Sequence, residues 1–373
     1  MADRKATRRE FLKIAGSTAA AATLISPLRA QEVEAEGNGK PFGYAVVGIG
    51  GLTTNSILPA FASAKQAKIV GLVSGDLNKA RQTGAKYGVP ESGLYTYDTF
   101  DRIADNPEID AIYIVLPNNM HAEYAIRGFK AGKHVLVEKP MANSTQECEA
   151  MIAAGKEANK LLSVGYRLRY EPYNQEMIRM AREQELGKSR AIVAEAGFNI
   201  GNPDQWRLSK SAAGGGSMMD IGIYALNAAR YLSGEEPTEV VALESTDRND
   251  PRFKEVEDTV TFQMKFPSGV LASCVSSYSA PFNRYRVHAE HGSFELEPAL
   301  SYSGIKMRVF AGGKVEPREF PNVNHFAAMM DDLASCAATG KTPRTDGKDG
   351  LNDVRIIEAI YESIETGKSV KLG

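Results

Sequence analysis

Residues 44–53 read Tyr-Ala-Val-Val-Gly-Ile-Gly-Gly-Leu-Thr, a short apolar stretch that runs into a glycine-rich turn. Apolar residues then recur at helical spacing over residues 55–64. A strand, a G-x-G turn and a helix in this order are typical of a dinucleotide-binding βαβ unit. Gly48 permits the tight turn, and Gly50 lets the backbone approach a pyrophosphate at the helix N-terminus. Thr53 stands in place of the usual third glycine or alanine, so we expect a looser contact there between helix and strand.

The alternation of strands and helices continues along the chain. Strands are expected at residues 69–73, 111–116, 134–137 and 161–165, and helices at residues 78–87 and 120–131. Continuous apolar strands that alternate with amphipathic helices indicate a parallel sheet covered on both faces. A ligand of such a sheet binds across the carboxyl ends of its strands.

The end of the second strand indicates which nicotinamide cofactor the fold takes. A site for NAD usually has an acidic residue at this point, which binds the ribose 2′-hydroxyl. The sequence has Ser74 here, with Lys79 and Arg81 close behind. A hydroxyl and two cations suit a 2′-phosphate, so we predict NADP. Asp76 keeps NAD open as the alternative, if its carboxylate turns toward the ribose.

Length and composition indicate a globular protein of more than one domain. The chain has 373 residues, 43% of them hydrophobic and 24% charged, which suits two packed domains and excludes disorder. The formal net charge of −2 gives no basic surface for nucleic acid. Three scattered cysteines form neither a disulfide framework nor a zinc cluster.

The first thirty residues predict an export signal. Arg8 and Arg9 precede Phe-Leu-Lys and a weakly hydrophobic run over residues 14–28, the pattern of a twin-arginine signal peptide. That run is too short to span a bilayer. We expect cleavage between Ala30 and Ala35, a mature protein in the periplasm without a membrane anchor, and an N-terminal arm over residues 31–41. Residues 1–30 hold six basic and two acidic side chains, so their removal leaves a mildly acidic chain of net charge −6.

Three further segments carry a family resemblance. They are Glu138-Lys139-Pro140, then Trp206-Arg207-Leu208, then Gly-Gly-Gly-Ser-Met-Met-Asp-Ile-Gly-Ile-Tyr at residues 214–224. In this order they resemble the Gfo/Idh/MocA oxidoreductases, and the similarity runs over nearly the whole chain after Phe42. Within the family the resemblance is strongest to members that oxidise one sugar while reducing another.

The resemblance implies a fold class and an organisation into domains. An α/β Rossmann domain is expected over residues 42–165, followed over residues 166–373 by an α+β domain with a large, mostly antiparallel, open-faced sheet. In the family that sheet often forms a dimer interface. The arm here is shorter than the proline-rich arm of tetrameric relatives, so we expect a homodimer.

The turn, the end of the second strand and the segments shared with the family together give the expected cofactor site. Its residues are Gly48, Gly50, Gly51, Leu52, Thr53, Ser74, Lys79, Arg81, Asn118, His121, Glu138, Lys139, Arg167, Trp206 and Arg207. By resemblance, the Trp206–Arg207 segment lies over the nicotinamide side of a tightly held NADP.

The expected catalytic residues are Lys139, Asp220 and Tyr224. Lys139 directly follows a strand and projects into the cleft, where burial beside a positively charged nicotinamide ring lowers its pKa. Asp220 and Tyr224 lie four residues apart and share one helix face. The resemblance makes Tyr224 the acid/base and Lys139 its helper, whereas the residues alone leave open which of the two accepts the proton. Substrate is expected to contact these three residues, Tyr166 and Arg169.

No metal site is expected. His288 and His291 are the only closely spaced histidines, and three-residue spacing on a strand puts their rings on opposite faces.

Export and cofactor retention together predict a reaction with two sugars. The periplasm supplies no exchangeable NADP, and even a nanomolar complex with an association rate of ~10⁶ M⁻¹s⁻¹ would dissociate at ~10⁻³ s⁻¹. Tightly bound NADP must then be reoxidised in place. We therefore predict ping-pong kinetics, in which one aldose leaves as a lactone and a second sugar leaves as its alditol. The alternatives are a conventional NAD(P)-dependent aldose dehydrogenase and a non-catalytic periplasmic sugar-binding protein.

Overall fold

The computed structural model describes residues 40–373. The predicted signal peptide over residues 1–30, its cleavage site and nearly all of the arm over residues 31–41 lie outside the described residues. These features stay predictions. Within the described residues, no helix is long and apolar enough to cross a bilayer.

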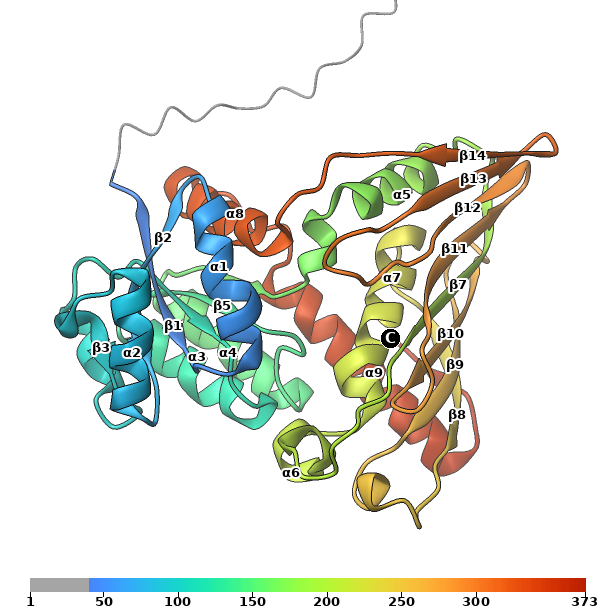
Figure 1. Ribbon diagram of the computed structural model, residues 1–373. Coiled ribbons are helices and arrows are strands. Elements are labelled where there is room, and N and C mark those ends of the chain that lie inside the picture. Colours follow the sequence, from blue (N-terminus) through green and yellow to red (C-terminus); the bar gives the residue numbers. More distant parts are fainter. Residues whose placement is uncertain (1–39) are drawn as a thin grey trace, which may run out of the picture. The chain divides into compact units, whose positions relative to one another are not determined.

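The first of two sheets has six parallel strands, five of them at the predicted apolar stretches (Figure 1). The strands run in the order β3-β2-β1-β4-β5-β6. Their bounds are β1 Phe42–Val47, β2 Ala67–Val73, β3 Leu94–Tyr95, β4 Ala111–Ile114, β5 His134–Val137 and β6 Leu162–Val164. β1, β4 and β5 are almost entirely buried because helices cover the sheet on both faces. The two-residue β3 was not predicted, because two residues are too short to show a pattern.

The helices of this part follow the strands in the expected order. They are α1 Leu58–Ala60, α2 Leu77–Tyr87, α3 His121–Lys130 and α4 Thr145–Glu157. The single helix expected over residues 55–64 is instead a π-helix Thr53–Ile57, the short α1 and a 3-10 turn Phe61–Ser63. Side chains of α3 and α4 pack on one face of the sheet, and those of α1 and α2 on the other.

The face that carries α1 is completed from far along the chain. Helix α8, His325–Thr339, packs Phe326 and Met330 into the same core cluster as Tyr44. The Tyr44 hydroxyl donates to the Met330 carbonyl at 2.8 Å, and the Asp331 carboxylate accepts from three successive backbone N–H groups at residues 65–67. By its packing, α8 therefore belongs with the first sheet. The expected division into two domains after residue 165 stays a prediction.

The second sheet is large and mostly antiparallel, as the resemblance implied. Its nine strands run in the order β14-β13-β12-β11-β7-β10-β9-β8-β15, and only β7 and β10 pair in parallel. Their bounds are β7 Ser189–Gly197, β8 Glu239–Ser245, β9 Thr259–Lys265, β10 Leu271–Ser277, β11 Asn283–Ala289, β12 Gly292–Leu296, β13 Met307–Ala311, β14 Lys314–Arg318 and β15 Val370–Lys371.

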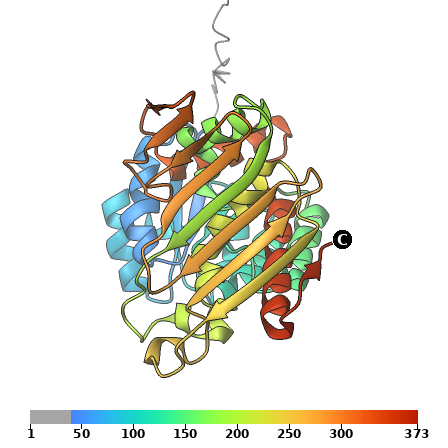
Figure 2. The same cartoon turned by 90° about the vertical axis from the view of Figure 1, so that its right-hand side faces the viewer.

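One face of this sheet is covered and the other is open, as Figure 2 shows. Helices α5 Pro172–Arg182, α7 Ile223–Ser233 and α9 Gly347–Thr366 pack on the inner face. Buried and exposed residues alternate strictly along β9, which is the pattern of a sheet with one solvated face. The inner layer brings the start of α7 toward the carboxyl ends of the first sheet, where the two clefts described below meet.

Candidate active site

A cleft of about 600 Å³ lies over the carboxyl ends of the parallel strands. The glycine-rich turn after β1 forms one wall. Gly48 has φ of +97°, and a Cβ there would lie 2.4 Å from the Val115 carbonyl oxygen, so only glycine fits. A Cβ at Gly50 or Gly51 would meet nothing within 4 Å, because both face open space. The turn thus offers bare backbone to a ligand, which fits a dinucleotide pyrophosphate.

Ser74, Asp76 and Lys79 line one end of this cleft. Asp76 caps α2: its Oδ1 accepts from the backbone N–H groups of Asn78 and Lys79 at 2.9 and 3.2 Å. The Ser74 hydroxyl accepts from the Asp76 N–H at 3.1 Å. A capping carboxylate is committed to the helix, so Ser74 and Lys79 remain as the groups best placed for a 2′-phosphate.

Arg81 does not share this position. Its guanidinium pairs with Glu91 at 2.7 Å, and among the described residues it does not line the cleft. The prediction that it binds the cofactor therefore finds no support in the geometry. Arg81 lies two residues beyond Lys79 on α2, and residues two apart on a helix do not face the same way.

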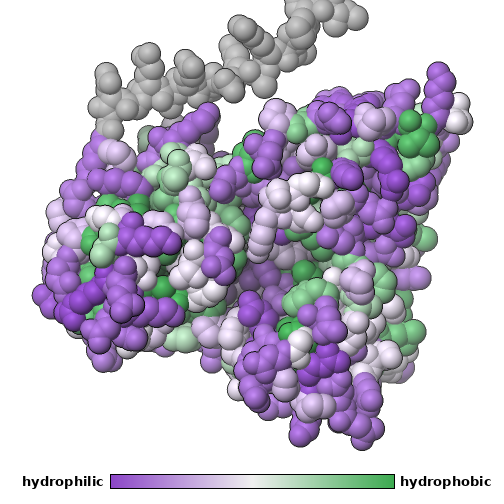
Figure 3. Space-filling model, viewed as in Figure 1, coloured by the Kyte–Doolittle hydropathy of each residue, from purple (hydrophilic) through white to green (hydrophobic). Residues whose placement is uncertain are grey.

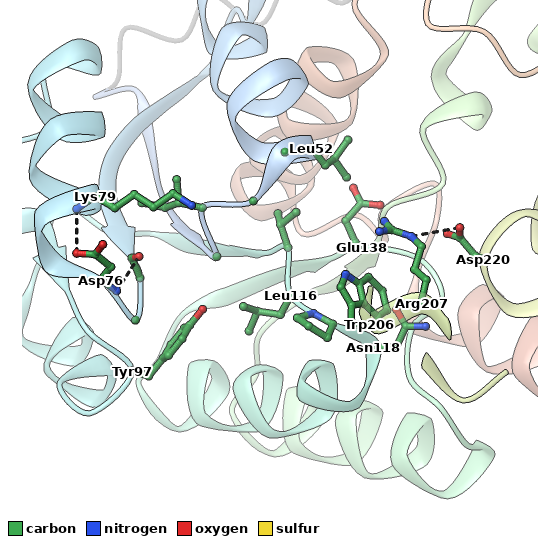
Figure 4. A pocket seen from close by; sticks show the side chains of 18 of the residues that line it. Leu52, Asp76, Lys79, Tyr97, Leu116, Asn118, Glu138, Trp206, Arg207 and Asp220 are labelled. Carbon is green, nitrogen blue, oxygen red and sulfur yellow. Dashed lines mark hydrogen bonds and ion pairs between the residues drawn. The ribbon is translucent and has the colours of Figure 1, made fainter. Parts of the chain in front are cut away.

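The other end of the cleft holds Asn118, Glu138, Trp206 and Arg207 (Figure 4). Asn118 is buried, and its side-chain amide donates to the Ala213 carbonyl at 2.9 Å, joining the first sheet to the short helix α6, Lys210–Ala213. The Arg207 guanidinium stacks 4.5 Å from the Trp206 ring. In Figure 4, Lys79 lies toward one end and this group toward the other, as an extended ligand would require.

A second cleft of about 510 Å³ adjoins the first. Figure 3 shows the surface hollowed between the part with the parallel sheet and the part with the second sheet. The residues that line both clefts are Gly51, Leu52, Glu138, Lys139, Arg207 and Asp220. A ligand in one cleft therefore meets a ligand in the other at these side chains.

The expected catalytic residues come together here. Lys139 Nζ lies 3.0 Å from Asp220 Oδ1 and donates to the Asp220 backbone carbonyl at 2.5 Å. Asp220 Oδ2 accepts from Arg207 Nε at 3.2 Å and from the Tyr278 hydroxyl at 3.1 Å. The Lys139–Pro140 peptide bond is cis. Asp220 is thus the centre of a small network of donors.

The pKa values of both partners in this ion pair are shifted. Burial acts to raise the pKa of Asp220, but Lys139 and Arg207 outweigh it and lower that pKa to about 2. Burial acts to lower the pKa of Lys139, but the Asp220 carboxylate outweighs it and raises that pKa. Among the groups that the structure describes, the Asp220 carboxylate, not foreseen as a partner of Lys139, thus outweighs the burial that was expected to lower the Lys139 pKa.

Tyr224 is the second residue of α7 and lines the second cleft. Lys139 Nζ lies 5.0 Å from the centre of its ring, and the Arg167 guanidinium lies 5.4 Å from it. Within the described chain, no hydrogen bond engages the Tyr224 hydroxyl. The hydroxyl is thus free to meet a substrate, with two cations close to its ring.

Arg167 was expected at the cofactor but lines the second cleft. It is buried, stacks 4.3 Å from the Tyr302 ring, and bonds to His325 Nδ1 at 3.2 Å and to the Leu300 carbonyl. Burial lowers the pKa of His325 to about 4, so this histidine is a neutral partner near pH 7. Arg167 therefore braces the wall of the second cleft.

Tyr166 and Arg169 were expected to contact substrate, but neither lines a cleft among the described residues. Tyr166 is 1% exposed. Arg169 pairs with Asp349 of α9 at 2.9 Å. The chain makes a 3-10 turn over Arg167–Tyr170, and this turn sends only Arg167 toward the cleft. A sequence position beside a binding residue does not predict such a change of direction.

His121 and Thr53, also expected at the cofactor, lie beneath the cleft. His121 Nδ1 is 2.9 Å from the Pro140 carbonyl and its Nε2 is 3.0 Å from the Leu116 carbonyl. Burial lowers its pKa to about 4. The buried Thr53 hydroxyl donates to the Gly48 carbonyl at 2.7 Å. Both support the backbone that forms the cleft, and neither lines it in the described structure.

Several site residues were not predicted. The second cleft has an aromatic and aliphatic wall that includes Phe198, Ile200, Leu300, Tyr302 and Phe326. The wall comes from segments far apart in sequence, so no local pattern could reveal it. Tyr278 directly follows β10, whose residues alternate between the two faces of the sheet. Nothing in that pattern indicates that the Tyr278 hydroxyl bonds to Asp220. No group of three or more potential metal ligands occurs among residues 40–373.

Comparison with known proteins gives the family. Residues 42–166 match the model of the oxidoreductase family with an NAD-binding Rossmann fold, and residues 174–295 match the Gfo/Idh/MocA C-terminal domain. This chain belongs to the Gfo/Idh/MocA oxidoreductase family. The resemblance seen in the sequence is confirmed.

Individual members of the family are similar over most of the chain. A crystal structure of aldose-aldose oxidoreductase from Caulobacter crescentus, complexed with glycerol, is 51% identical with a TM-score of 0.88, covering 89% of this chain and 100% of that one. D-xylose 1-dehydrogenase [NADP(+)] of Haloarcula marismortui is 30% identical over 89% of this chain and 93% of its own. A 3-ketoreductase from Actinomadura kijaniata, in complex with TDP-benzene and NADP, is 22% identical with a TM-score of 0.78 over 87% of this chain and 98% of that one, and shares the fold. The chain is an oxidoreductase of this family.

Proposed function

We propose that the protein oxidises an aldose at C1 to its lactone and reduces a second sugar to the alditol, using one NADP that it retains. The observation that carries the proposal is the junction of the two clefts at Lys139 and Asp220, with Tyr224 beside them. The 51% identity to a chain described as an aldose-aldose oxidoreductase supports the choice of sugars.

The residues of the first cleft fit NADP. Gly50 and Gly51 leave room at the turn, Lys79 and Ser74 offer a cation and a hydroxyl for a 2′-phosphate, and the far end reaches the junction. Relatives named for or solved with NADP support this choice over NAD. When bound, NADP would supply hydride transfer at the junction.

The second cleft suits a sugar ring. Its apolar wall can cover the C–H face of a pyranose, while Lys139, Arg207, Asp220 and Tyr224 can bind hydroxyl groups. Arg167 would hold the wall and the Tyr224 ring in place.

The chain must also move one proton for each half-reaction. Tyr224, whose phenol oxygen has no hydrogen-bond partner in the described residues, would act as the phenolate and take the proton of the anomeric hydroxyl, and the phenol so formed would return that proton to the second sugar. Lys139 and Arg167 would stabilise the negative charge that develops on the phenol oxygen. Asp220 would hold Lys139 at the junction and keep it charged. This assignment makes Tyr224 the acid/base and Lys139 its helper.

The proposal also includes the compartment and the assembly of the protein. We propose export of the folded chain by the twin-arginine machinery, a periplasmic location and a homodimer formed through the open face of the second sheet. Val241, Leu243 and Leu271 are exposed apolar residues on its strands.

Retention of the cofactor gives the kinetic form of the proposal. An enzyme without exchangeable NADP must regenerate it by a second substrate in the same cleft, which makes the kinetics ping-pong.

One experiment separates this proposal from its alternatives. Purified protein without added cofactor is expected to gain absorbance at 340 nm on addition of an aldose and to lose it on addition of a second sugar. Protein that contains no nucleotide, and that turns over sugars only with added NADP, would instead be a conventional aldose dehydrogenase. Protein that binds sugar but never changes absorbance would be a binding protein.

A further inference from the structure

Near the junction of the two clefts, a buried glutamate hydrogen-bonds to the backbone of the glycine run over residues 214–216. Glu257 lies two residues before β9 and is 4% exposed. Its Oε2 accepts from the Gly216 N–H at 2.7 Å. Its Oε1 accepts from the Met218 N–H at 2.9 Å and from the Tyr361 hydroxyl at 3.0 Å. The carboxylate thus binds the backbone on both sides of Ser217.

Such a carboxylate is costly to bury, so its placement needs a reason. Burial raises the pKa of Glu257, while hydrogen bonds from Met218 and Gly216 act against that rise. Three donors converge on the group, and hydrogen bonds to an ionised carboxylate are among the stronger ones in proteins. The side chain therefore fixes the backbone it touches more firmly than an ordinary loop contact would.

The glycines are bare because Glu257 and Tyr361 come so close. A Cβ at Gly215 would lie 2.0 Å from the Tyr361 hydroxyl, and a Cβ at Gly216 would lie 2.1 Å from the Glu257 backbone oxygen. Neither glycine needs a left-handed backbone, since only Gly214 of the run has a positive φ. Close approach of this pair thus explains two of the three glycines.

The backbone that Glu257 binds is also hydrogen-bonded to Asp220. Gly216 donates its N–H to Glu257, and its carbonyl accepts the Asp220 N–H at 3.2 Å. Asp220 lies in the π-helix Met218–Gly222, a geometry often found at functional sites. We propose that Glu257, with Tyr361, is a positioning residue that sets the start of this π-helix, so that Asp220 meets Lys139. This inference rests on the proposed function.

A cavity of about 290 Å³ beside Glu257 contains a second glutamate that can serve as a matched control. Glu257, Tyr361 and Glu365 all line it, but Glu365 is exposed, and no hydrogen bond joins it to the glycine run in the described structure. In Glu257→Gln an amide N–H₂ replaces one acceptor and must face a backbone donor. Glu365→Gln makes the same chemical change in the same cavity and removes no hydrogen bond from the glycine run.

The first measurement is hydrogen exchange of the full protein, which does not depend on activity. We expect peptides that contain residues 216–220 to exchange at least about ten times faster in Glu257→Gln, and at the wild-type rate in Glu365→Gln. Tyr361→Phe, which removes one donor and leaves both backbone bonds, is expected to show a smaller effect. If Glu257→Gln does not fold, Glu257→Asp, whose shorter side chain cannot hold both backbone N–H groups as Glu257 does, carries the test. Unchanged exchange in the Glu257 variant tested would overturn the proposal.

The second measurement is turnover per bound nucleotide. A displaced Asp220 is expected to lower kcat by about 10- to 100-fold with nucleotide content nearly unchanged, and to raise the KM for sugar because Asp220 lines the second cleft. Faster exchange with unchanged kcat would overturn the positioning role and leave a structural one. A wild-type protein inert toward sugars would overturn the proposed function instead. The exchange rate of the Asp220 amide would then still decide whether Glu257 sets its position.

Discussion

Lys139 and Asp220 form a half-buried ion pair across the junction of the two clefts, with 3.0 Å between Nζ and Oδ1. Lys139 follows β5 of the first sheet, whereas Asp220 lies in the π-helix before α7. A second bond, from Lys139 to the Asp220 backbone carbonyl, ties the lysine to the helix itself. The pair therefore fixes the place where the two parts of the fold meet.

Replacing Lys139 is expected to abolish most of the turnover. Lys139→Ala removes the cation beside Tyr224 and leaves Asp220 paired only with Arg207 and Tyr278. We expect kcat to fall by about 100-fold or more. Stopped-flow absorbance at 340 nm after addition of an aldose measures the loss. Lys130→Ala, at an exposed position on α3, is the matched control and should leave the rate unchanged.

Replacing Tyr224 separates chemistry from binding. Tyr224→Phe keeps the ring that Lys139 and Arg167 approach and removes only the hydroxyl. We expect both half-reactions to slow by about 100-fold or more while sugar affinity, measured by calorimetry, changes little. Tyr173→Phe, which loses a hydroxyl bonded to Phe320 away from the clefts, should behave as wild type. Retention of full activity in Tyr224→Phe would assign the proton to another group, with Lys139 the first to test.

The fold could be predicted from the sequence because its signals are local. Continuous apolar strands and the turn at Gly48 give the parallel sheet and the position of its ligand without any long-range information. The second sheet followed from the family resemblance, since one solvated face interrupts the continuous apolar pattern along its strands. The return of α8 to the first sheet could not be foreseen, because only the packed core shows that Phe326 and Met330 lie beside Tyr44.

The candidate site was predictable where a motif fixes direction and unpredictable elsewhere. Lys139 leaves the end of a strand, which always faces the cleft, and Asp220 and Tyr224 share the start of one helical segment. Tyr166 and Arg167, in contrast, are neighbours in a tight turn, and only one of them faces a cleft. Ion pairs such as Arg81 with Glu91 join positions whose proximity depends on the tertiary fold.

Lys79 and Arg81 offer a matched pair of cations for testing cofactor choice. Lys79 lines the cleft, whereas Arg81 is paired with Glu91 outside it. Lys79→Ala is expected to weaken NADP binding by about 10- to 100-fold, the value of a charge-assisted hydrogen bond, and to leave NAD binding nearly unchanged. Arg81→Ala should alter neither. Titration of protein stripped of nucleotide by denaturation and refolding gives both affinities. Equal losses in the two variants would contradict the placement of the 2′-phosphate at Lys79.

Asp220 should also make stability depend on pH in a defined window. Its pKa is lowered to about 2 in the folded chain, because Lys139 and Arg207 outweigh the effect of burial. A depressed carboxyl pKa contributes stability above its unfolded value near 4, and that contribution disappears as the pH falls toward 2. At pH 6 we expect Asp220→Asn to be less stable than wild type by roughly 2 kcal/mol from this linkage, and the difference should shrink steadily below pH 4. Urea unfolding at several pH values, with the exposed Asp204→Asn as control, measures it. A difference that stays constant from pH 6 to pH 3 would mean that the lost bonds of Asp220, and not its charge, stabilise the junction.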